Sequence, residues 1–165
     1  MLYIYTTAWF KNCENVRTDS FDEIEQGIEK YKTQGKVFIT GDFNSRTANN
    51  PDYIELNRFL DSNQLSDSCN NVLPRVNKDQ VLDRRGMRLL DLCKHTGYNI
   101  ANGRLGKDRN IGEYTFINNN GMSVVDYLIL HKNNFQYIKD FEVRSPDDLS
   151  DHCALRFCID GNVLS

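Results

Sequence analysis

The chain has 165 residues, of which 39% are hydrophobic and 26% are charged, and its formal net charge is −3. These values predict one globular domain over residues 1–165 and argue against a disordered chain. The small net charge gives no support of its own for a nucleic-acid partner, and the apolar start at residues 1–10 is too short to span a bilayer.

The first half of the chain predicts a strand, a helix and a second strand. We expect a strand at Leu2–Thr7. Ser20-Phe-Asp-Glu23 is a capping box that opens a helix, and Gly35 supplies its stop. The continuous apolar run Val37–Ile39 is typical of a strand that is buried on both faces.

The second half predicts one more helix followed mainly by strands. Arg84–Thr96 reads as a helix closed by Gly97, and a strand follows at residues 98–101. The inward residues of this helix are expected to be Met87, Leu89, Leu90 and Cys93. Further strands are expected at residues 114–117 and 123–130, forming a hairpin with a polar turn at 118–121, and at residues 141–143 and 153–159. This mixture predicts an α/β sandwich with a sheet covered by helices on one face.

The distribution of charge and the cysteine pattern bear on the partner and the cellular compartment of the protein. Residues 71–112 hold nine basic and four acidic side chains, a net of +5, between flanks of net −4 each. Such a segment either faces a polyanion or, more commonly, is a solvated surface. The five cysteines include no Cys-x-x-Cys pair, which argues against a disulfide framework or a zinc site. A reducing intracellular compartment, nucleus or cytoplasm, is expected.

Polar residues stand at the end of the buried strand, in Gly41-Asp42-Phe43-Asn44. A rigid sheet can fix such groups so that they converge on one point. Asp42 can orient and deprotonate a water molecule, and Asn44 can donate to a phosphate oxygen. The same residues also suit an ordinary turn with an Asx cap.

A second group is Ser150-Asp151-His152 together with Asp126, which interrupts the apolar run of residues 123–130. A buried carboxylate needs a partner, and a histidine is the natural one. Asp151 suits a metal ligand beside a phosphate-binding imidazole. Tyr3 or Tyr5 could reach a phosphate, although aromatic residues in strands usually belong to the core.

The order of these motifs resembles the endonuclease/exonuclease/phosphatase superfamily. The intervening stretches Gly86–Lys94, Ile100–Arg104 and Tyr114–Phe116 look like the endonuclease domain of non-LTR (LINE-type) retrotransposons. The resemblance covers about residues 3–158. It implies a deoxyribonuclease-like, four-layer α/β/β/α sandwich, of which the N-terminal sheet would be largely missing here.

The resemblance also implies residue roles. Asp42 would be the water-activating aspartate, Asn44 the phosphate-contacting asparagine, and Asp126 the acid that orients His152, which stabilises the phosphate. Asp151 would belong to the metal site. Ser123 matches a substrate-binding serine of the retrotransposon branch, and Tyr3 or Tyr5 would be the family's tyrosine, in a strand end that lacks the usual proline.

The resemblance further implies Mg²⁺- or Mn²⁺-dependent phosphodiester hydrolysis of DNA, in a longer polyprotein with a reverse transcriptase domain. The family's early asparagine and metal-binding glutamate have no counterpart ahead of Tyr3, so the domain is expected to be truncated and incomplete. Two alternatives stay open: a catalytically inactive remnant or interaction domain, and a phosphatase of the same superfamily.

Overall fold

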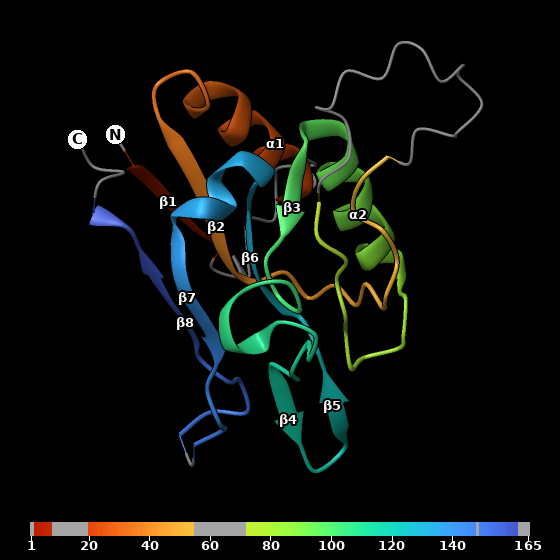
Figure 1. The fold of residues 1–165 in the computed structure, drawn as a ribbon. Helices are drawn as coiled ribbons and strands as arrows, with labels where there is room; N and C mark the ends of the chain where they lie inside the picture. Colours follow the sequence, from red (N-terminus) through yellow and green to blue (C-terminus); the bar gives the residue numbers. More distant parts are fainter. Residues whose placement is uncertain (1, 8–19, 55–71, 148, 162–165) are drawn as a thin grey trace, which may run out of the picture.

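The computed structural model describes residues 2–7, 20–54, 72–147 and 149–161, with main chain only for residues 2–7 (Figure 1). The strands are β1 Leu2–Thr7, β2 Lys36–Asp42, β3 Tyr98–Ile100, β4 Phe116–Asn118, β5 Gly121–Ser123, β6 Asp126–His131, β7 Ile138–Val143 and β8 Leu155–Ile159. The helices are α1 Ser20–Tyr31 and α2 Arg84–Thr96, with the 3-10 turns η1 Gly106–Asp108 and η2 Lys132–Tyr137.

Helix α2 begins and ends where local sequence signals predict, whereas α1 begins at the expected Ser20 but ends at Tyr31, before the expected stop at Gly35. Helix α1 starts at Ser20 and buries Phe21, Ile24 and Ile28. Helix α2 is capped by the Asp83 side chain, which accepts from the Gly86 N–H, and ends at Gly97 with φ of 74°. The expected inward position of Met87 is wrong, because this side chain is 48% exposed.

Four strands form a central sheet in the order β1-β2-β6-β3. Strands β1 and β2 are parallel, whereas β6 runs antiparallel to both β2 and β3. The apolar run in β2 is buried on both faces, as predicted. Val37 and Ile39 pack in the core cluster on the helix side, and Phe38 packs in the cluster on the opposite side.

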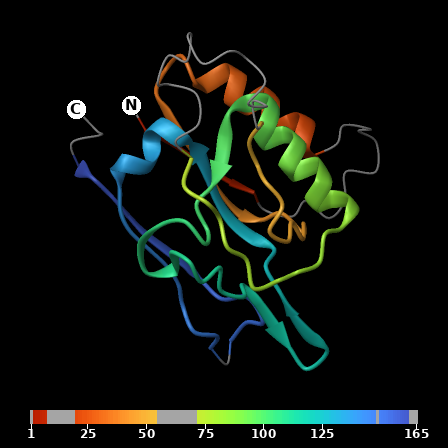
Figure 2. The same cartoon turned by 45° about the vertical axis from the view of Figure 1, so that its right-hand side comes forward.

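The antiparallel pair β7·β8 covers the second face of the sheet. Phe141 of β7 joins Phe38, Leu128 and Leu130 in this second core cluster, and Phe157 of β8 packs against it. Figure 2 shows α1 and α2 on one side of the sheet and the blue strands β7 and β8 on the other. The described residues therefore form three layers, α/β/β, which agrees with the predicted α/β class. The fourth layer of the expected sandwich is not among them.

The hairpin predicted from residues 114–117 and 123–130 is wrong in its second strand. Strands β4 and β5 form a two-stranded ribbon, and Val124 and Val125 then lead into β6 of the central sheet. The change of partner occurs because Phe43 N–H donates to the Val125 carbonyl, while the Thr115 hydroxyl accepts from the Val125 and Asp126 N–H groups.

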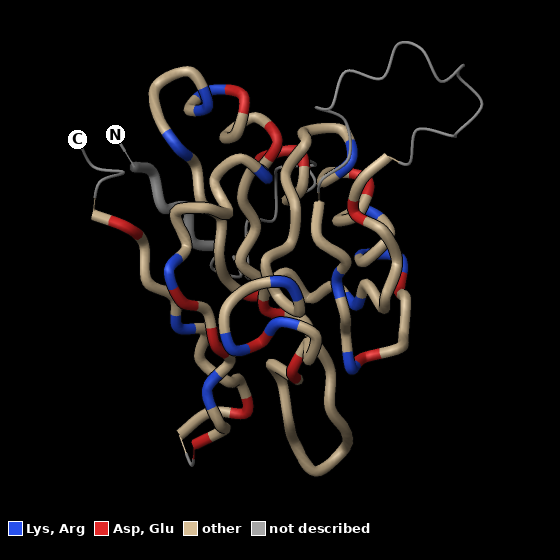
Figure 3. The backbone as a smooth tube through the Cα atoms, in the orientation of Figure 1, with Lys and Arg blue, Asp and Glu red and all other residues tan. Residues whose placement is uncertain are grey.

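The described part of the basic segment, residues 72–112, does not form one continuous cationic surface. Arg104 is 1% exposed and pairs with the fully buried Asp52 at 2.5 Å. Lys78, Arg88 and Lys107 pair with acidic residues of other segments. Figure 3 shows basic and acidic positions interspersed along the described chain. Within that part, no helix has the length and apolar character needed to cross a membrane.

Candidate active site

Asp42 and Asp126 lie at the same edge of the central sheet. Strand β2 ends at Asp42, β6 begins at Asp126, and the two residues are direct cross-strand partners. Two motifs that are far apart in the sequence therefore meet because β2 and β6 are antiparallel.

The Asn44 turn holds the Asp42 carboxylate from two sides. The Asn44 backbone N–H donates to Oδ1 at 2.7 Å, and its side-chain amide donates to Oδ2 at 3.1 Å. Asn44 has φ of 48°, in the left-handed region that asparagine tolerates better than most residues. Asp42 is half-buried and Asn44 is exposed, so this carboxylate has a fixed orientation and remains open to solvent.

The expected contact between Asp126 and His152 is present. The imidazole Nδ1 lies 3.0 Å from Oδ2 and 3.2 Å from Oδ1 of Asp126. The ring of Phe116 meets the imidazole edge-on, with centroids 4.9 Å apart, and the two residues also form an isolated β-bridge. The carboxylate and the aromatic ring together fix the plane of the imidazole.

Asp126 is 9% exposed and lies in a polar environment made largely by Thr115. Burial raises the pKa of the Asp126 carboxyl, and hydrogen bonds with the His152 and Thr115 side chains partly oppose this shift. The nearby Asp42 carboxylate also raises the pKa. Thr115 is fully buried, and its hydroxyl accepts the Val125 and Asp126 N–H groups at 2.9 Å each.

A pocket of about 240 Å³ opens beside this pair. Its wall includes three of the residues expected in the site, two further charged residues and an apolar side. The lining residues are Asn44, Arg46, Asp83, Phe116, Ser123, Val125 and His152. The pocket thus combines hydrogen-bond donors and a cation with an apolar side, a combination suited to a phosphoester.

Asp151, the expected metal ligand, is placed differently from the other expected site residues. Asp151 is exposed. Its main-chain carbonyl accepts from the Ile117 N–H at 2.8 Å, and this bond holds the loop beside β4. Among the described residues, no group of three or more His, Cys, Asp or Glu side chains is arranged to hold a metal ion. Mg²⁺ is usually held by one or two carboxylates together with waters and substrate phosphates. An exposed carboxylate such as Asp151 fits that donor set as one ligand.

The two tyrosine candidates are placed only by strand register. Tyr3 and Tyr5 of β1 stand opposite Val37 and Ile39 of β2. Ile39 precedes Asp42 by three residues, which corresponds to about 10 Å along a strand. The tyrosine side chains lie outside the described residues, so their expected role stays a prediction.

Sequence reasoning missed three residues of the site as candidates in their own right. Thr115 and Phe116 carried only a family resemblance, and Arg46 carried none. Thr115 could have been found because its hydroxyl stands between two aromatic residues of an expected strand. A hydroxyl that is buried there must find hydrogen-bond partners. Arg46 follows the Gly-Asp-Phe-Asn motif by two residues, but only the tertiary fold places it in the pocket.

No family model matches the chain. No curated protein sequence matches it either.

Solved structures do match. The chain is similar to the endonuclease domain of TRAS1, a telomere-specific non-LTR retrotransposon, with a TM-score of 0.50 and 18% identity over 86% of this chain and 52% of that one. It is also similar to the 3'-5' exonuclease NExo from Neisseria meningitidis, with a TM-score of 0.50 and 18% identity over 85% of this chain and 52% of that one. The chain thus spans about half the length of these structures, and it shares their fold.

Proposed function

We propose that this chain carries the phosphate-cleaving residues of a DNA phosphodiesterase of the retrotransposon-endonuclease type. One observation carries the proposal: His152 is hydrogen-bonded to the buried Asp126 and lines a pocket together with Asn44 and Ser123. Fold alone does not assign an activity. The proposal therefore rests on the side chains, and the structural neighbours, an endonuclease domain and an exonuclease, support its class.

The roles of the residues follow from their contacts. With Nδ1 held by Asp126, the other imidazole nitrogen, Nε2, is available to donate to a phosphoryl oxygen. Preorganised donors aimed at developing negative charge are usually the largest contribution to such catalysis. Asn44 and Ser123 would donate to the non-bridging phosphate oxygens.

Asp42 would orient the attacking water and accept its proton. Its two oxygens already accept from Asn44, which fixes the carboxylate without burying it. A general base needs a water within hydrogen-bond reach and a carboxylate that stays ionised near neutral pH. The half-buried position of Asp42 at the sheet edge leaves room for such a water beside it.

We further propose that Mg²⁺, or Mn²⁺ in its place, supports the reaction, with Asp151 as one ligand. The ion, when bound, would offset negative charge on the phosphate. Because the chain spans about half of the structures that it matches, we propose that other ligands come from the part of the fold that it does not span. Cleavage by the chain alone would then be slow.

Plasmid nicking tests the proposed activity. The chain is incubated with supercoiled plasmid in Mg²⁺, in Mn²⁺ and in excess chelator, next to His152→Ala, Asp42→Asn and the matched control His95→Ala. His95 is exposed near the end of α2 and does not line the pocket. The expected result is metal-dependent nicking by the wild type and the control, with losses of about 10²-fold or more in the two site variants.

Equal nicking by the wild type and both site variants would refute the proposal. No nicking by any protein would favour the reading as an inactive interaction domain. A DNA substrate with a 3'-phosphate, assayed in parallel, separates the phosphatase alternative: release of phosphate without strand cleavage would assign the site to a phosphomonoesterase.

A further inference from the structure

Among the described residues of the pocket wall, Arg46 has the only side chain with a permanent positive charge. The acidic residue in the wall, Asp83, is already engaged, because its Oδ1 accepts the Gly86 N–H at 2.6 Å as the cap of α2. His152 is held by Asp126. A phosphate that enters the pocket therefore meets Arg46 as its fixed cation.

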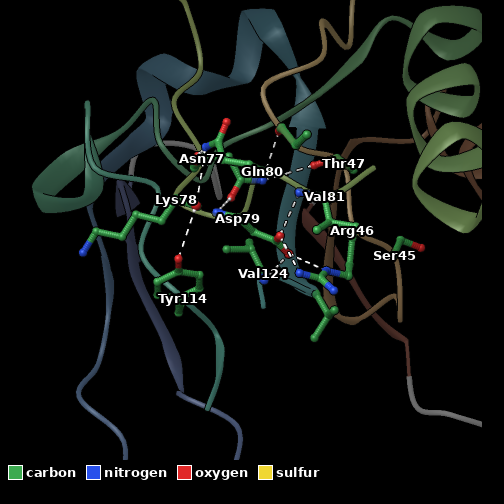
Figure 4. A network of polar contacts seen from close by, with 12 residues as sticks. Ser45, Arg46, Thr47, Asn77, Lys78, Asp79, Gln80, Val81, Tyr114 and Val124 are labelled. Atoms are coloured by element: carbon green, nitrogen blue, oxygen red, sulfur yellow. Dashed lines mark hydrogen bonds and ion pairs between the residues drawn. The ribbon is translucent and has the colours of Figure 1, made fainter. Parts of the chain in front are cut away.

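A buried carboxylate holds the Arg46 guanidinium in place. Nε and Nη2 of Arg46 donate to the two oxygens of Asp79, each at 2.7 Å (Figure 4). The Asp79 side chain is 1% exposed and also accepts the N–H groups of Val81 at 3.0 Å and Val124 at 3.2 Å. This bidentate pairing fixes both the position and the plane of the guanidinium.

The pairing uses only part of the guanidinium. Arginine has five N–H donors, and a bidentate pair uses two of them. Within the described part of the chain the three others have no hydrogen-bond acceptor, and the Arg46 side chain is 33% exposed. Two backbone amides share the charge of Asp79, so the ion pair leaves Arg46 able to attract a further anion.

The pair is stable as an ionised unit. Hydrogen bonding to Asp79 raises the pKa of Arg46. Burial raises the pKa of Asp79, but the hydrogen bonds from Arg46, Val81 and Val124 outweigh it and leave this pKa below its ordinary value. Val124 directly follows Ser123 of the pocket wall, so Asp79 connects two segments of that wall.

From this geometry we propose that Arg46 binds a phosphate of the DNA strand in the pocket, and that Asp79 is the positioning residue that aims it. The inference rests on the proposed function for its substrate class, a phosphodiester. An oriented guanidinium loses little freedom when it binds phosphate, which favours arginine over lysine at such a position. Asp79 would act on the substrate only through Arg46.

Salt-dependent binding tests Arg46. Fluorescence anisotropy of a short labelled DNA duplex is measured in chelator, where no cleavage is needed, over salt concentrations of about 50 to 200 mM. Arg46→Met should bind several-fold more weakly at low salt and reduce the slope of log K against log salt by about one. The matched control is Arg88→Met, which removes an exposed arginine that pairs with Asp22 outside the pocket.

A second variant separates binding from folding. Arg46→Met leaves Asp79 buried without its partner and is expected to lower the melting temperature. Arg46→Lys keeps a cation beside Asp79 but lacks the second donor edge, so it should melt close to the wild type and still lose the contact. An Arg46→Lys protein that melts normally and binds DNA with the wild-type slope would overturn the inference, as would a wild type without salt-dependent binding.

Asp79→Asn tests the positioning role. This change removes a negative charge next to Arg46, so DNA affinity should stay the same or rise, whereas kcat should fall about tenfold because the guanidinium is no longer aimed. A role in stability alone would lower affinity and kcat together, and that result would overturn the assignment of Asp79. If Arg46 contributes to DNA binding but no DNA is cleaved, only the proposed hydrolysis is refuted. If DNA is cleaved but its binding does not depend on Arg46, only this inference is refuted.

Discussion

Two opposing requirements meet at the Asp126 carboxyl. Burial favours its protonated form, whereas the proposed role beside His152 needs the ionised form. In the unfolded chain this carboxyl titrates near 3.9. Its folded pKa lies higher, so the stability that it contributes is fully present below about pH 3.9 and is lost as the pH rises through the folded pKa.

Asp126→Asn separates stability from activity. The amide keeps a similar shape but does not ionise, so the variant avoids the loss of stability that the wild type undergoes between the unfolded and folded pKa values. Melting temperatures are measured from acid to neutral pH. Between the unfolded and folded pKa values, the melting temperature of the variant should rise relative to that of the wild type. At pH 7 the variant should melt no lower than the wild type. Its cleavage rate should fall about 10²-fold or more. A variant that becomes relatively less stable as the pH rises would contradict the assigned direction.

Thr115 is predicted to matter for folding as well as for the site. Thr115→Val removes the acceptor of two buried N–H groups, those of Val125 and Asp126. An unsatisfied buried polar group costs about 1–3 kcal/mol, so urea unfolding should show a loss of about 2 kcal/mol or more. Thr96→Val is the comparison variant, because the Thr96 hydroxyl donates to the Leu92 carbonyl within α2 and accepts one N–H, that of Tyr98, at 3.4 Å. Equal losses in both variants would argue against the special place of Thr115.

At the scale of elements, the two helices show which parts of the fold are predictable. The start signal Ser20-Phe-Asp-Glu23 and the cap at Gly97 each involve only a few neighbouring residues, so both helices could be placed from the sequence. The split between β5 and β6 depends on Phe43, which is distant in the sequence from Val125, and on Thr115, which precedes Val125 by ten residues. Such tertiary contacts override a local strand pattern.

A pair of glycines tests how α2 is seated against the pocket. A Cβ atom on Gly86 of α2 would lie 1.9 Å from the Arg46 carbonyl oxygen, whereas a Cβ atom on Gly27 of α1 would meet nothing within 4 Å. Gly86→Ala should therefore destabilise the fold by about 1–3 kcal/mol or more. Gly27→Ala should stabilise it by about 0.5–1 kcal/mol. Thermal unfolding of both variants checks the prediction, and a neutral Gly86→Ala would contradict the close approach.

At the scale of the whole molecule, the layered fold could be predicted but the distribution of charge could not. Asp42, Asp126 and His152 were identified because each is a polar residue next to an apolar strand, and the central sheet brings the two aspartates together. The basic segment did not indicate in the same way where the cation of the pocket lies. Arg104 is buried against Asp52, and Arg46, the cation that lines the pocket, lies outside that segment.

The most direct test of the account is a double-mutant cycle on the single-turnover rate of DNA cleavage. The rate constants of the wild type, Asp126→Asn, His152→Ala and the double variant are measured at one pH with substrate bound. Because Asp126 is proposed to act through His152, which it contacts at 3.0 Å, the two losses should not add, and the double variant should be about as slow as His152→Ala alone. Fully additive losses, or a His152→Ala protein that cleaves at the wild-type rate, would contradict the account.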